Sequence, residues 1–114
     1  MPINFDLKDT FDEMLSSAKQ SAGESGKEAK GVATRFLQNR KERLQLLAEL
    51  RLAGDLNDEK FKSRLEDEKL ILEAELKAMA VISKSSAQNT AQSVINIFQS
   101  AVVKALPEVL RSTT

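Results

Sequence analysis

The stretch LQLLAELRLAGDLNDEKFKSRL, residues 44–65, decides the fold of this 114-residue chain. Leucines recur at three-residue steps before Gly54, and the apolar pattern resumes at Phe61. Such spacing places apolar side chains on one face of a helix. A glycine just past the last apolar position is a common helix C-cap, and Asn57 with two following acids is a favourable N-cap. The stretch therefore predicts two antiparallel helices joined by a turn at 54–57.

The same stretch resembles the SHOCT domain, a short helical hairpin found at the ends of many bacterial proteins. The shared pattern covers about residues 44–72, and its turn is carried by Gly54, Leu56, Asn57, Asp58, Glu59 and Phe61. The resemblance implies a bacterial protein with a self-associating hairpin, and it says little about function. This chain departs from the pattern because its second helix continues far past the hairpin.

Apolar spacing predicts helices on both sides of the hairpin, so we expect one all-α domain over residues 1–114, either a long helical hairpin or a small bundle. We expect an N-terminal helix within 1–26, capped by Asn4, Asp6 or Thr10, and a hinge at Gly23–Gly26. The expected hairpin comprises residues 27–53 and 58–84. An uncharged helical extension follows at 85–106, and Pro107 begins a tail that runs through 107–114.

The length of the helix after the turn is the main structural question. Neither glycine nor proline occurs from Asp55 through Leu106. An unbroken helix over 58–106 would be roughly 70 Å long, and its second half would need to pair with another chain, as in a coiled coil. Alternatively, serines near Ser83–Ser86 break the helix, and the chain makes a four-helix bundle. We favour the continuous helix, because the absence of breakers is a direct observation.

Residues 85–103, SSAQNTAQSVINIFQSAVV, carry no charge in a chain of which 30% is charged. A helix here has an apolar face whose candidate interaction residues are Val94, Ile95, Phe98, Val102 and Leu106. Leaving such side chains in water forgoes roughly 1.5–3 kcal/mol each. We expect this face to be buried in a homo-oligomer; the alternatives are docking into a separate protein partner and binding to a lipid surface. Interfacial membrane helices usually carry Lys and Arg on their polar face, so we do not expect membrane binding.

Composition argues against an enzyme. The chain has no His and no Cys, so the usual nucleophile–base pairs, thiolate metal sites and Glu-x-x-His di-iron sites cannot be built. The segment Gly23–Lys27 resembles a phosphate-binding loop, but Ser21 stands at its first glycine position and Glu28 at its Mg²⁺-binding hydroxyl. We expect a hinge there. No catalytic residue, metal, cofactor or small-molecule substrate is predicted.

Charge gives no general attraction to nucleic acid, because 17 basic residues balance 17 acidic ones. Residues 27–53 are locally basic, with Arg35, Arg40, Lys41, Arg43 and Arg51, but Glu42 and Glu49 interrupt them and the chain has no Tyr or Trp. The N-terminus lacks the features of a signal peptide, and no apolar run reaches about 18 residues. We therefore expect a soluble cytoplasmic protein that acts as a non-catalytic structural or interaction element.

Overall fold

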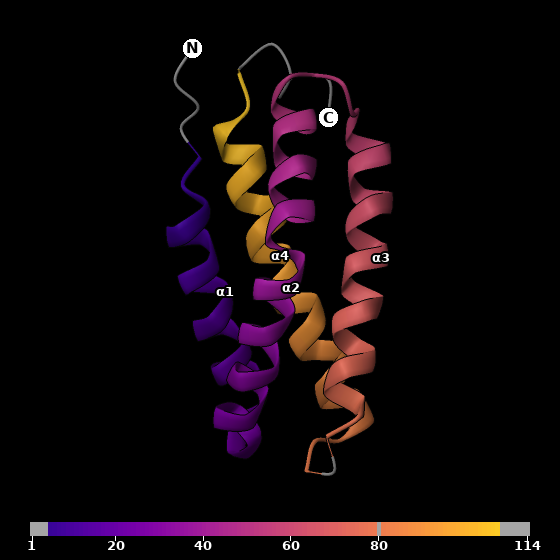
Figure 1. Ribbon diagram of the computed structural model, residues 1–114. Helices are drawn as coiled ribbons and strands as arrows, with labels where there is room; N and C mark the ends of the chain where they lie inside the picture. The colour runs from indigo at the N-terminus through magenta and orange to yellow at the C-terminus, as the bar shows by residue number, and fades with distance from the viewer. Residues whose placement is uncertain (1–4, 80, 108–114) are drawn as a thin grey trace.

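The computed structural model describes residues 5–79 and 81–107, and these form an all-α bundle, which confirms the predicted fold class (Figure 1). The elements are α1 (Leu7–Ser21), a short 3₁₀ turn η1 (Gly23–Ser25), α2 (Gly26–Leu52), α3 (Asp58–Lys77) and α4 (Lys84–Ala105). The predicted tail lies outside the described residues beyond Pro107.

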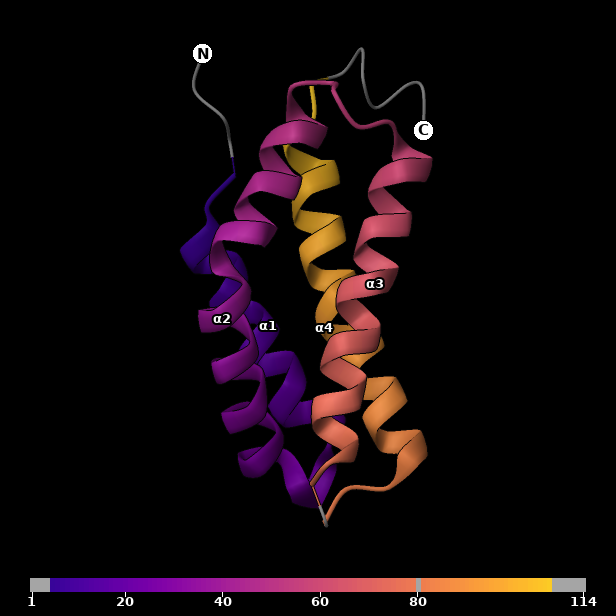
Figure 2. The ribbon, with the colours of Figure 1, turned by 45° about the vertical axis from the view of Figure 1, so that its right-hand side comes forward.

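The helices run alternately down and up, so that each is antiparallel to the next (Figures 1 and 2). α1 packs against α2 and α4, while α3 packs closely along α4 and more loosely along α2. Short connections favour this arrangement, because a short loop places consecutive helices next to each other in antiparallel orientation.

Three side chains set the starts of α1, α3 and α4. The Asp6 carboxylate accepts a hydrogen bond from the Asp9 N–H at 3.0 Å, and Asn57 accepts one from the Lys60 N–H at 2.8 Å. Ser83 accepts one from the Ser86 N–H at 3.1 Å. Each bond satisfies a backbone donor that a helix start would otherwise leave unpaired. Between α2 and α3, Gly54 takes a φ of 84°, a left-handed conformation that suits glycine.

The continuous helix that we favoured over 58–106 is wrong, because α3 ends at Lys77 and α4 begins at Lys84. The Ser83 hydroxyl oxygen caps the start of α4. A serine that bonds to the backbone in this way favours the start of a new helix over the continuation of the preceding one. Folding back at this point lets α4 bury its apolar face against α1 and α3 of the same chain, so the exposure that would have required a second chain does not arise.

Phe98 lies at the centre of the core. Its ring is fully buried and meets Phe5 edge-on with ring centroids 6.0 Å apart, while the ring of Phe61 lies 6.4 Å away. One side chain of α4 thus contacts the segment before α1 and the first turns of α3. Aromatic pairs of this kind add to the burial of their apolar area.

We predict that Phe98→Ala lowers the free energy of unfolding by about 3–5 kcal/mol, because the cavity would open at the junction of three elements. Urea denaturation followed by circular dichroism would measure the change. Asn96→Ala, at an exposed position of the same helix, is the control and should change stability by less than about 0.5 kcal/mol. Equal losses for the two variants would contradict the central position of Phe98.

Candidate functional site

The interaction residues predicted on α4 lie inside the molecule. Val94, Ile95, Phe98, Val102 and Leu106 each expose at most 3% of their surface. We predicted that this face is buried between chains, but it is covered by helices of the same chain. A second chain or a partner could reach it only after the bundle opens. The functional surface therefore has to be sought elsewhere.

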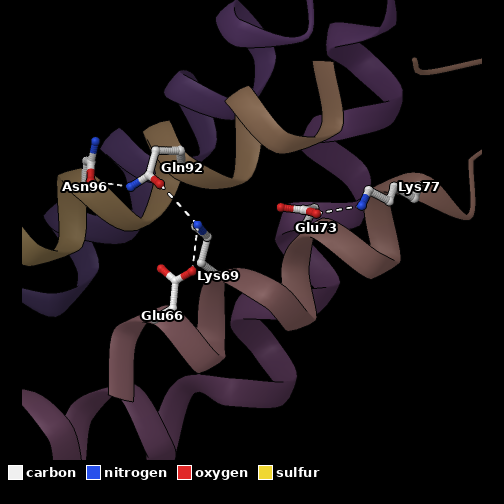
Figure 3. A network of polar contacts seen from close by, with 6 residues as sticks. All are labelled: Glu66, Lys69, Glu73, Lys77, Gln92 and Asn96. Atoms are coloured by element: carbon white, nitrogen blue, oxygen red, sulfur yellow. Dashed lines mark hydrogen bonds and ion pairs between the residues drawn. The ribbon is translucent and has the colours of Figure 1, made fainter. Parts of the chain in front are cut away.

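The polar face of α4 takes part in a surface network with α3 (Figure 3). Lys69 pairs with Glu66 at 2.9 Å and also donates to the Gln92 side-chain oxygen at 3.3 Å. Gln92 in turn donates to Asn96 at 2.8 Å. Exposed contacts of this kind contribute little stability individually. Through these contacts, the uncharged side chains of Gln92 and Asn96 on α4 connect α4 to the neighbouring α3.

The acidic residues of α3 do not assemble a metal site. Glu73 pairs with Lys77 one turn later at 2.6 Å, and the Glu68 carboxylate points inward to α2. Among the residues that the structure describes, no three His, Cys, Asp or Glu side chains are grouped as metal ligands would be.

A groove of about 1080 Å³ lies between α1 and α2. Its apolar lining comes from Phe5, Leu7, Phe11, Leu15, Leu37, Ala48 and Leu52. We call this surface the α1–α2 groove. Its lining residues belong to the first half of α1 and to the later part of α2, away from the turn that joins the two helices. The groove therefore lies at the end of the α1–α2 pair away from the corner that joins them.

Both signs of charge occur along the rim of the α1–α2 groove. The acidic side chains are Asp6, Asp12 and Glu49, and the basic ones are Lys8 and Lys41. The first four apolar lining residues remain only half-buried, in contrast to the fully covered side chains of the core. An apolar floor with a charged rim is the usual pattern of a site that receives an amphipathic helix.

Sequence reasoning missed the α1–α2 groove. Leu7, Phe11 and Leu15 follow helical spacing, but nothing in the sequence indicated a groove beside them. Spacing indicates which face of a helix is apolar, whereas the degree of closure depends on how far α2 lies from that face. No local signal in either helix reports that distance.

Two of the predicted basic residues of α2 are engaged with the interior. Arg40 forms a two-pronged ion pair with the buried carboxylate of Glu68, with Nε–Oε1 at 2.8 Å and Nη2–Oε2 at 2.5 Å. The hydrogen bond to Glu68 raises the pKa of the Arg40 guanidinium. Arg51 is 2% exposed and donates through Nη1 to the Leu56 carbonyl at 3.3 Å. Its Nε and Nη2 have no hydrogen-bond partner.

The remaining predicted basic residues, Arg35, Lys41 and Arg43, are exposed. The segment that resembles a phosphate-binding loop forms η1 and the first turn of α2, directly after a helix. A phosphate-binding loop follows a β-strand, so the local structure differs from that motif.

The comparisons with known proteins give no relative. No protein-family model matches the chain, and neither the curated proteins nor the solved structures contain a significant match. Of the helices in residues 5–79 and 81–107, none has the length and apolar character needed to cross a membrane.

We predict that Arg40→Met lowers the free energy of unfolding by about 2 kcal/mol or more, because it leaves the Glu68 carboxylate buried without its partner. The double variant Arg40→Met with Glu68→Leu should recover to within about 1 kcal/mol of the wild type. Lys62→Met, which breaks the exposed pair with Asp58, is the control and should cost less than about 0.5 kcal/mol. Urea denaturation measures all three. A double variant no more stable than Arg40→Met would contradict this account.

We predict that Arg51→Met raises the free energy of unfolding by about 1 kcal/mol or more. Methionine fills similar volume without a buried charge, and this gain exceeds the single hydrogen bond to Leu56. Thermal denaturation would measure the change, with the exposed Arg43→Met as control. A loss of stability on replacing Arg51 would show that its guanidinium is satisfied in solution.

Proposed function

We propose that this chain is a non-catalytic interaction protein that binds an amphipathic helix of another protein in the α1–α2 groove. The observation that carries the proposal is the groove itself: a wide apolar channel, bordered on both sides by helices and lined by half-buried Phe and Leu side chains. A helix laid in such a channel would make the same contacts that neighbouring helices already make elsewhere in the bundle.

The size of the groove supports this occupant. Its volume of about 1080 Å³ exceeds that of most small-molecule pockets, which are about 300–1000 Å³ and bury most of the ligand. The groove runs along two helices and does not enclose a ligand on all sides. Acids and bases alternate along the rim, so the flanks of a bound helix would need charges of both signs.

The proposal needs no cofactor and no reaction. It assigns the work of the protein to helix–helix association, as the leucine and phenylalanine spacing predicts. It also keeps the cytoplasm as the site of action, because a chain without cysteine suits a reducing compartment.

Leu15→Gln tests the proposal, because this side chain lines the groove without being fully buried. The probe is a designed amphipathic peptide of about 18 residues, with leucines on one face and alternating Lys and Glu on its flanks, labelled for fluorescence anisotropy. We expect saturable binding to the wild type and an affinity about tenfold lower for Leu15→Gln, equivalent to about 1.4 kcal/mol.

The matched control is Leu70→Gln, which makes the same change at a half-exposed position of α3 outside the groove. It should bind the peptide as the wild type does. Circular dichroism would establish that both variants keep their helices. If the two variants bound equally well, or if the wild type gave no saturable binding, the α1–α2 groove would not be the interaction site.

A further inference from the structure

The corner between α1 and α2 contains one residue in the left-handed conformation, Gly23. Ala22 has φ −86° and ψ −3°, Ser25 has φ −93° and ψ 16°, and Gly26 has φ −58° and ψ −42°. These values lie in or beside the right-handed helical region. Gly23, with φ 58°, is the only positive-φ residue between α1 and α2. Joining the two helices into one requires Gly23 to enter the helical region and the short turn around it to straighten.

Gly26 is a second glycine whose lack of a side chain the closed corner uses. A Cβ added to Gly26 would collide with the backbone carbonyl oxygen of Lys19. In a continuous helix, residues seven apart are roughly 10 Å apart along the axis, so this contact would be lost. Both glycines are therefore required by the closed corner, and neither is required by the open one.

α1 cannot remain uncovered when the corner opens. Its inward face carries Thr10, Met14 and Ala18, all buried against neighbouring helices. A second copy of the chain offers the same binding site for this face, and the antiparallel relation of α1 to α2 can be kept between two chains as well as within one.

We propose that the corner is a hinge and that two copies exchange α1, giving a symmetric dimer in which residues 7–52 of each chain form one helix. This helix would be roughly 70 Å long. The exchange goes beyond helix binding in the α1–α2 groove. Each groove is rebuilt in the dimer from α1 of one copy and α2 of the other, so either proposal can fail without the other.

An exposed apolar side chain at the corner end of the bundle supports this arrangement. The connection between α3 and α4 lies at the same end (Figures 1 and 2), and its Val81 is 64% exposed. Its carbonyl oxygen accepts a hydrogen bond from the Ser25 hydroxyl at 2.8 Å, which places it against the corner. When α1 is exchanged, the corner ends of the two bundles face each other, and this apolar side chain comes to the contact between them.

Light scattering coupled to size exclusion tests the exchange in the full-length chain after refolding at high protein concentration. We expect a wild type that is mainly monomeric with a minor dimer. In Gly26→Ala, whose closed corner is blocked, the dimer should dominate, with a dissociation constant at least about tenfold lower. Gly23→Ala should shift in the same direction, because alanine disfavours the left-handed conformation and favours helix.

Gly31→Ala is the matched control. Gly31 lies within α2, and an added Cβ would meet nothing within 4 Å, so the variant raises helix propensity without affecting the corner. It should behave as the wild type does. Should Gly26→Ala fail to fold, Gly23→Ala decides the question, because its added Cβ also has open space. Folded monomers in every glycine variant that folds would overturn the proposal.

Cross-linking distinguishes exchange from simple docking of two closed bundles. Asp9 and Ser100 are exposed and line one hollow between α1 and α4, and the chain has no cysteine of its own. The variants Asp9→Cys and Ser100→Cys, each in a background of Gly23→Ala, are mixed, refolded together and treated with a short bis-maleimide. Exchange predicts covalent pairs that contain one copy of each variant. A dimer without such mixed pairs would overturn the proposal.

Discussion

The fold depends on one constraint: the apolar face of α4 has to leave water, and it does so against α1 and α3 of the same chain. Residues 85–103 supply no charge with which to hold that face in solvent. Five of its side chains are buried almost completely, with Phe98 against Phe5 and Phe61. The reversal at Ser83 follows from this need, because a helix that continued past Lys77 would carry the face away from α1 and α3.

The sequence predicted the fold class well because that depends on spacing, which is local. Gly54 with Asn57 marks the turn between α2 and α3, and the structure places it between Leu52 and Asp58. The sequence was misleading about helix continuity for a physical reason. Serine permits a helix as well as capping one, so the choice at Ser83 is made by the burial of residues far along the chain. The α1–α2 groove was beyond sequence reasoning because the gap between helices is a tertiary quantity.

Two charged side chains lie buried in the bundle, Glu68 of α3 with a partner and Arg51 of α2 with two nitrogens that lack one. Arg40 and Glu68 satisfy each other, and because their two hydrogen bonds need a fixed geometry, they set the register of α2 against α3 where the two helices are only loosely packed. Arg51 makes a single bond near the turn. A buried guanidinium with two unpaired nitrogens lowers the stability of the end of the bundle where the α1–α2 groove lies.

The two ends of the bundle therefore differ in how they limit α1. At the corner, α1 is fixed by geometry that only two glycines permit, and at the other end it lies beside an incompletely filled groove. If α1 were packed tightly along its whole length, it could neither leave the bundle nor leave the α1–α2 groove open. Along the groove, Phe11 and Leu15 are only partly buried, and local opening begins where side chains are least buried. The partner binding and the exchange of α1 that we propose can be separated experimentally, because the groove substitution lies within α1 and the glycine substitutions lie at the corner.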